Sequence, residues 1–218
     1  MQLPRVQTSC NKKLKTDNCQ LKRKEPMQNQ SDPGITRDEA LQLMKEYLKA
    51  DNLQKHSLAT EAIMRRMALK MGEDEDLWGI AGLLHDLDYE ETKDAMSRHT
   101  LHTEKILQER GVSQEIIEAI KGHNAENLGY TREKTIDHAL TCAECITGMI
   151  VATTLVYPDK KLSSVKPKSI IKRMKQKEFA RSVNREHIRE CEKIGIPLEN
   201  FAELCLNAMR NISEELGL

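Results

Sequence analysis

Residues 80–88 read Ile-Ala-Gly-Leu-Leu-His-Asp-Leu-Asp, an apolar run that ends directly in His85 and Asp86. The apolar part predicts a buried helix, and the two polar side chains at its end would then face an interior cleft. Burying an imidazole and a carboxylate costs free energy unless they are paired or bind a metal ion. The stretch therefore predicts a helical core with a candidate metal site at its edge.

A helical period continues on both sides of this stretch. Thr36 and Glu39 form a capping-box pattern ahead of the first expected helix. Glycines close several of the others, with Gly122 expected just past the end of the fifth. No alternating strand pattern appears, so the predicted fold class is all-α, a helical bundle. After the first helix, the others are expected at about 53–72, 74–86, 97–110, 113–121, 134–155, 169–181, 184–194 and 198–216.

The N-terminal residues differ from the rest of the chain. Residues 1–33 are rich in Lys, Gln, Asn and Ser and have no helical or strand period. Such a segment cannot bury enough apolar surface to offset the entropy of ordering it. We expect a disordered basic tail over residues 1–33, followed by one helical domain over residues 34–218.

Composition excludes several functional classes. The formal net charge is zero and aromatic residues make up 3% of the chain, so nothing signals nucleic-acid binding. The longest apolar candidate, Ile146 to Val156, falls short of the ~20 residues that span a bilayer, so no membrane association is expected. Without a secretory signal, the expected location is the cytoplasm. The six cysteines then stay reduced, and Cys142 and Cys145 are expected as buried small residues.

Polar side chains interrupt several of the apolar helices. His56 lies on an apolar helix upstream of His85, and His99 and His123 follow downstream. Glu144 stands in an otherwise apolar helix, where a carboxylate is normally excluded. Because a helical bundle can direct such side chains inward at one point, we expect them to converge on a metal site.

The pattern of His56, then His85-Asp86, then a later acid resembles the HD-domain superfamily of metal-dependent phosphohydrolases. The similarity extends to the HDIG-type subgroup of unassigned substrate and covers about residue 36 to about 210. It rests on Gly82-Leu-Leu-His-Asp-Leu-Asp-Tyr-Glu, Lys105-Ile-Leu-Gln-Glu-Arg-Gly-Val, Ala119-Ile-Lys-Gly-His-Asn, Ile146-Thr-Gly and the segments around 151–158 and 179–186. The resemblance implies an HD-domain-like helical bundle.

Carried over by position, the resemblance implies metal ligands at His56, His85, Asp86 and position 144. The family pattern has Asp at position 144, whereas this chain has Glu. The extra methylene moves the carboxylate by about 1.5 Å, so the helix shifts or metal affinity falls.

His99 and His123 match the additional histidines of superfamily members that hold two ions. His99 fits the spacing to Ile106-Leu107 better than His102 does. With both, Asp86 would bridge a pair of ions; otherwise the two histidines support the ligands or bind substrate phosphate. His102, His138 and His187 have no such match and are expected as surface or hydrogen-bonded core residues.

The implied chemistry is hydrolysis of a phosphoester, such as a nucleotide, by a metal-activated water. A His and carboxylate set suits Mn, Fe, Ni, Co or Zn, with Mg also considered, as one ion or two. Asp86, His85 and Lys121 are the expected catalytic residues. Three roles stay open for the acids that follow the ligand pair: a general base, an outer partner that orients a ligand, or part of a solvated loop. These acids are Asp88, Glu90 and Glu91.

A phosphorylated substrate requires cationic groups near the metal. Lys93, Arg98 and Lys121 lie close in sequence to the expected ligands and are the candidates for substrate binding. The alternative function is a catalytically silent metal-binding module for regulation or interaction, for which Glu144 leaves room. The oligomeric state is not predicted.

Overall fold

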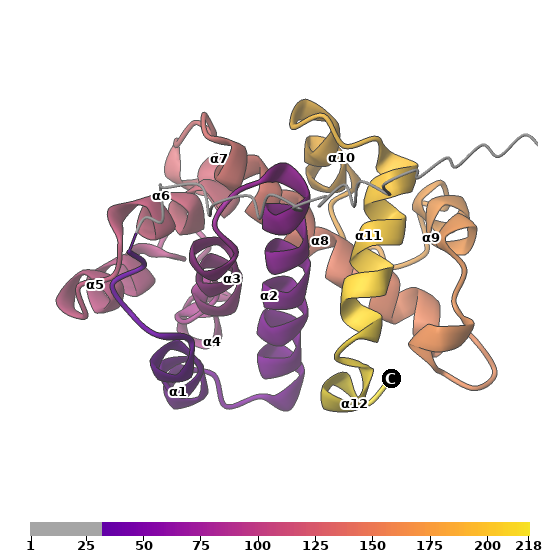
Figure 1. Ribbon diagram of the computed structural model, residues 1–218, viewed down its shortest axis with the longest axis horizontal. Helices are drawn as coiled ribbons and strands as arrows, with labels where there is room; N and C mark the ends of the chain where they lie inside the picture. Colours follow the sequence, from indigo (N-terminus) through magenta and orange to yellow (C-terminus); the bar gives the residue numbers. More distant parts are fainter. Residues whose placement is uncertain (1–31) are drawn as a thin grey trace, which may run out of the picture. The chain divides into compact units, whose positions relative to one another are not determined.

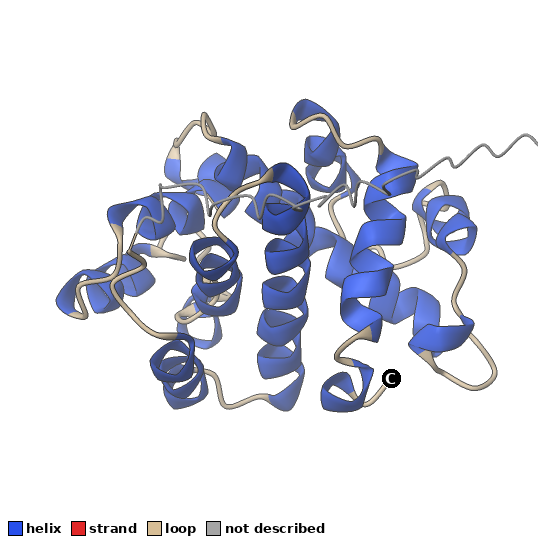
Figure 2. Ribbon diagram, viewed as in Figure 1, coloured by secondary structure: helices blue, strands red, loops and turns tan. Residues whose placement is uncertain are grey.

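The computed structural model describes residues 32–218, and these residues form helices and loops without a strand (Figure 2). The expected tail therefore lies almost entirely outside the described residues. Pro33 already belongs to the folded unit, because its carbonyl accepts a hydrogen bond from Ser113 N at 2.9 Å. The helices, with one short 3-10 turn η1, are α1 Arg37–Tyr47, α2 Asp51–Met71, α3 Glu75–Leu84, α4 Tyr89–Thr92, α5 Leu101–Glu109, α6 Gln114–His123, α7 Ala125–Leu128, α8 Thr135–Leu155, η1 Leu162–Ser164, α9 Pro167–Met174, α10 Arg185–Lys193, α11 Leu198–Arg210 and α12 Ser213–Leu216.

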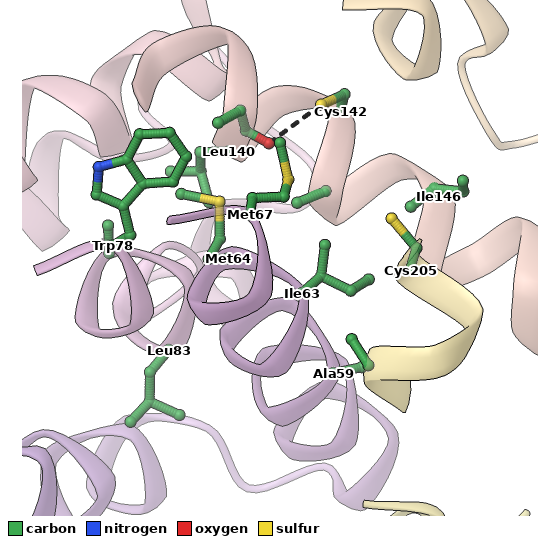
Figure 3. Close-up of a cluster of buried hydrophobic side chains, with 14 of the residues drawn as sticks. Ala59, Ile63, Met64, Met67, Trp78, Leu83, Leu140, Cys142, Ile146 and Cys205 are labelled. Carbon is green, nitrogen blue, oxygen red and sulfur yellow. Dashed lines mark hydrogen bonds between the residues drawn. The ribbon is translucent and has the colours of Figure 1, made fainter. Parts of the chain in front are cut away.

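Two long helices, α2 and α8, form the centre of the folded unit (Figure 1). Helix α2 packs against α3, α8 and α11, and α8 packs against α6 and α10 as well. Their shared core joins Ile63 and Met67 of α2 to Leu140 and Ile146 of α8, with Cys205 of α11 alongside (Figure 3). This core confirms the predicted all-α fold.

Helix α8 has an unusually apolar sequence. By length and composition it could cross a membrane, with a mean hydropathy of 1.3 over its best window. The expectation that no apolar segment approaches such a length was therefore wrong. However, 67% of that window is buried inside the folded unit, so packing against the neighbouring helices accounts for its apolar character.

Helix α5 begins at Leu101, four residues after the expected start at Ser97. No local side chain caps it, because Thr100 makes no capping hydrogen bond. Instead the carboxylate of Asp88, twelve or more residues away, accepts hydrogen bonds from the backbone N–H groups of Thr100, His102 and Thr103, each at 3.1 Å. A remote cap of this kind leaves no sequence signal at the helix start.

Two further helix ends differ from expectation. Helix α9 stops at Met174 rather than near residue 181, and the chain that follows wraps around the Arg185 guanidinium, which donates to the carbonyls of Gln176, Phe179, Ala180 and Val183. Helix α6 extends through Gly122 to His123, and Gly122 is a contact with α8 and not a helix end: a Cβ there would meet Asp137 Cβ at 3.1 Å.

Gly82 sets the distance between α3 and α2. A Cβ at this position would lie 3.0 Å from Glu61 N, Thr60 C and Met64 Cγ, two of which are backbone atoms that cannot rotate away. The absence of a side chain therefore lets α3 approach α2 closely enough for the side chains at the end of α3 to reach those of α2.

We expect Gly82→Ala to lower the free energy of unfolding by about 1–2 kcal/mol. Overpacking costs about 1–3 kcal/mol, whereas the better helix propensity of alanine returns up to about 1 kcal/mol. Gly148→Ala is the matched control, because its Cβ would meet only the rotatable Val183 side chain. Urea unfolding of both variants measures the difference, and equal stability of the two would contradict this account of Gly82.

Candidate metal centre

Five side chains from four separate segments meet at one point. His56 comes from α2, His85 and Asp86 follow α3, His99 precedes α5, and His123 is the last residue of α6. His85, Asp86, His99 and His123 are all buried, and His56 is half-buried. The helical bundle therefore brings together the five residues that the sequence singled out as converging ligands, leaving Glu144 aside.

Asp86 divides these residues into two groups of three. Its Oδ2 lies 3.4 Å from His85 Nε2 and 3.8 Å from His56 Nε2, and the two imidazole nitrogens are 3.2 Å apart. We call His56, His85 and Asp86 the first triad. These three residues offer ligand atoms that lie close enough together to hold one metal ion.

The other oxygen of the same carboxylate serves the second triad, which consists of Asp86, His99 and His123. Asp86 Oδ1 lies 3.3 Å from His99 Nε2 and 3.6 Å from His123 Nε2, and these two nitrogens are 3.0 Å apart. One carboxylate with one oxygen in each triad is the arrangement in which a single Asp bridges two ions.

The opposite ring nitrogens of these histidines are already occupied. Nδ1 of His85 lies 2.8 Å from Gly82 O, and Nδ1 of His123 lies 2.5 Å from Ile120 O. A carbonyl can only accept, so both rings carry their proton on Nδ1. The Nε2 atoms that face Asp86 are then left with lone pairs, which is the tautomer that binds a metal.

The same logic extends to His56 through Thr147. The hydroxyl of Thr147 donates to Glu144 O at 2.6 Å, so it accepts from His56 Nδ1 at 2.9 Å. Thr147 thus fixes the ring of His56 and leaves Nε2 free to act as a ligand. A threonine inside an apolar helix has no distinguishing signal, so this role of Thr147 cannot be predicted from the sequence.

Burial and the mutual contacts of Asp86 and the histidines determine which side chains of the centre are charged. Burial lowers the pKa of both His56 and His85 to about 4 and also lowers the pKa of His123, so these rings are neutral near pH 7. Burial would raise the pKa of Asp86, but the surrounding histidines hold it well below its usual range. The donor set therefore includes three neutral imidazoles, those of His56, His85 and His123, and an ionised carboxylate, and such ligands suit a divalent cation of the Mn-to-Zn series.

Asp88 contacts the second triad at the ring nitrogen of His99 that does not face Asp86. It is fully buried, and its Oδ1 accepts from His99 Nδ1 at 2.8 Å and from Thr100 N. Thr100 has a φ of 75°, a left-handed conformation that costs a β-branched residue about 1–3 kcal/mol. Burial opposes protonation of His99, but its hydrogen bonds to Asp86 and Asp88 raise its pKa to about 9. The position of Asp88 therefore supports the role of an outer partner of the ligand His99 and not that of a residue in a solvated loop.

A comparison with protein-family models matches residues 53–151 to the HD domain. These residues belong to the HD-domain superfamily. The matched segment contains both triads and ends within α8. No curated protein and no solved structure matched the chain. The HD domain is that of a superfamily of metal-dependent phosphohydrolases, and HD domains bind divalent metal ions.

Glu144 stands at the position for which the resemblance implied an aspartate ligand. Its carboxylate is in neither triad; its Oε1 instead accepts a hydrogen bond from Cys145 Sγ at 2.8 Å. Burial raises the pKa of Glu144 to about 8. Glu144 lines the same pocket as the triads, but the structure does not bring it together with the other five expected ligands.

The three cationic residues expected to bind substrate do not line this pocket. Lys93 and Arg98 are exposed, and Lys121 Nζ pairs with Glu104 Oε1 at 2.9 Å. Closeness in sequence to a ligand does not fix the direction of a side chain on a helix or turn. Lys55, one residue before His56, is the lysine that does line the pocket among the described residues.

The remaining candidates divide into structural residues and pocket residues. His102 is exposed and pairs with Glu91, and His138 Nδ1 contacts Glu190 Oε2 at 2.5 Å, so both agree with the expectation for unmatched histidines. His187 is half-buried and its Nε2 lies 3.2 Å from Glu126 Oε1, which also agrees, and in addition it lines the pocket. Cys142 is buried as expected, whereas Cys145 is half-buried and also faces the pocket.

The two triads open into a pocket of about 740 Å³, a size suited to a small organic ligand. Four residues of the metal centre line it, namely His56, Asp86, His99 and His123. Another part of its wall is apolar and comes from α2, α8 and the C-terminal residues, namely Leu53, Val151, Ala152, Leu155, Leu216 and Leu218. The pocket thus combines a candidate metal centre with room for an apolar group.

Proposed function

We propose that this protein hydrolyses a small phosphoester with two divalent metal ions held by His56, His85, Asp86, His99 and His123. The observation that carries the proposal is the division of the Asp86 carboxylate, with one oxygen in each triad. The HD-domain match of residues 53–151 supports it independently.

When bound, the ions would lower the pKa of a coordinated water and polarise the phosphoryl oxygen. The protein side chains would do the rest by position. Asp88 and Thr147 orient His99 and His56, which keeps the Nε2 lone pairs directed at the centre. Asp86, with its pKa held low, keeps its negative charge to bind both ions.

The apolar residues that line the pocket indicate which alcohol group the phosphoester substrate carries. Among the described residues that line the pocket, Tyr89 is the single aromatic apart from histidines, so a base-stacking platform is poorly represented. We therefore favour a phosphomonoester with an aliphatic or small aromatic alcohol over a nucleotide.

The test is phosphate release by the full chain with added Mn²⁺ from a panel of alkyl phosphates, an aryl phosphate and nucleotides. We expect release that a chelator abolishes and Mn²⁺ restores. Stoichiometric metal without turnover on any member of the panel would instead support the alternative, a catalytically silent metal-binding module.

Lys55 is the proposed cationic contact for the substrate phosphate. Its side chain is 37% exposed and its ammonium pairs with Asp51 at 2.9 Å, which leaves it able to exchange partners. A charge-assisted hydrogen bond contributes about 1.5–3 kcal/mol, so Lys55→Gln should raise KM about tenfold or more with little change in kcat. Lys93→Gln, outside the pocket, is the control and should leave both constants unchanged; a loss in that variant alone would reverse the assignment.

A further inference from the structure

A second cluster of metal-ligating groups lines the same pocket, outside both triads. Glu144 and Cys145 come from α8, and His187 comes from α10. One ligand atom from each of the three lies within 4.8 Å of the other two. All three face the pocket, and none is fully buried.

This cluster is not part of the metal centre described above. It shares no residue with the first or second triad, and His187 lies beyond the segment that matches the HD domain. It also contains a thiol, whereas both triads use only imidazole nitrogens and a carboxylate. The cluster therefore needs an explanation of its own.

We propose that Glu144, Cys145 and His187 form a separate binding site for a zinc-like ion. A thiolate, an imidazole and a carboxylate match the ligands that zinc takes in proteins, whereas Mg²⁺ and Ca²⁺ prefer all-oxygen shells. Three protein ligands beside an open pocket leave a fourth position for water or for a ligand in the pocket, as in zinc sites that bind exogenous molecules.

The hydrogen bond between Cys145 and Glu144 is compatible with replacement of protons by a metal ion. Cys145 Sγ donates a hydrogen bond to Glu144 Oε1 at 2.8 Å, so the two ligand atoms already lie side by side. Binding of the metal ion releases the thiol proton and the proton of the Glu144 carboxyl to solvent, and it leaves a thiolate and a carboxylate as ligands with no change in oxidation state.

Supporting residues behind His187 fit a ligand role. Glu126 Oε1 lies 3.2 Å from His187 Nε2, and Arg132 holds Glu126 through two hydrogen bonds of 2.7 Å. A carboxylate beside a ligating histidine orients the ring and raises its basicity. The salt bridge to Arg132 lowers the pKa of Glu126 to about 2, so this carboxylate stays ionised.

Cobalt(II) is the probe that separates this site from the two triads. A cobalt–thiolate bond gives a charge-transfer absorption in the near ultraviolet, which imidazole and carboxylate ligands do not give. We expect the full chain titrated with Co²⁺ to show this band and Cys145→Ser to lose it. His187→Gln should weaken Co²⁺ binding at the thiolate by about tenfold or more.

Cys142→Ser is the matched control, since this thiol lies one helical turn away, is buried in the core and does not line the pocket. It should keep the band, and so should His85→Ala, which damages only the first triad. Circular dichroism checks that each variant is folded. A wild-type protein without the band, or a band unchanged in folded Cys145→Ser or His187→Gln, would overturn the proposal. Because the readout is spectroscopic, it stands or falls separately from phosphohydrolase activity.

Discussion

Asp86→Ala is expected to remove both ions of the metal centre at once and to reduce phosphate release by more than about 100-fold. Loss of an outer partner of a ligand costs about 10–100-fold in affinity or activity, and Asp86 is itself the ligand shared by both triads. Elemental analysis of the purified variant, together with the phosphate-release assay, measures the two effects.

His56→Ala is the comparison for this prediction, because His56 belongs to the first triad alone. We expect it to lose one ion per chain and to keep the other. If Asp86→Ala kept one ion while His56→Ala lost both, the carboxylate would not be the shared ligand and the proposed arrangement would be wrong.

Asp88→Asn is expected to be the most disruptive substitution that leaves every ligand in place. The buried carboxylate accepts from His99 Nδ1 and from three backbone N–H groups, which also begin helix α5. An amide replaces one accepting oxygen by a donor, so at least one of these N–H groups loses its partner. Leaving such groups unsatisfied in the interior costs about 1–3 kcal/mol each, and metal affinity at the second triad should fall about 10–100-fold.

Thermal unfolding and metal titration of Asp88→Asn test these two consequences separately. Glu91→Gln serves as the control, because Glu91 is exposed and contacts only His102. It should match the parent chain in both measurements. Normal metal binding by a destabilised Asp88→Asn protein would show that Asp88 caps α5 without orienting His99.

The helical fold and five convergent residues could be predicted because both depend on patterns that are visible in the order of residues along the chain. Apolar periodicity locates α2, α3 and α8, and polar residues such as His56 and His123 stand out against it. The long helices were therefore placed well, and the shared site followed from their convergence.

The errors arose where contacts between distant segments decide the structure. Asp88 sets the start of α5, and Arg185 sets the chain path after α9; neither effect has a local signal. The side-chain direction of Lys121, which turns to Glu104, was likewise hidden. The position of His187 beside Glu144 and Cys145 also has no local signal, because these pocket neighbours come from α8, more than 40 residues earlier in the chain.

The division of one carboxylate between two triads makes the two ion sites thermodynamically dependent on each other. Fixing the plane of Asp86 through Oδ2 also places Oδ1 for the other group of histidines. Binding of the first metal ion orders the Asp86 side chain and carries the entropy cost of doing so. Binding of the second ion does not carry this cost again. The centre should consequently fill cooperatively, with a metal titration steeper than that of two independent sites.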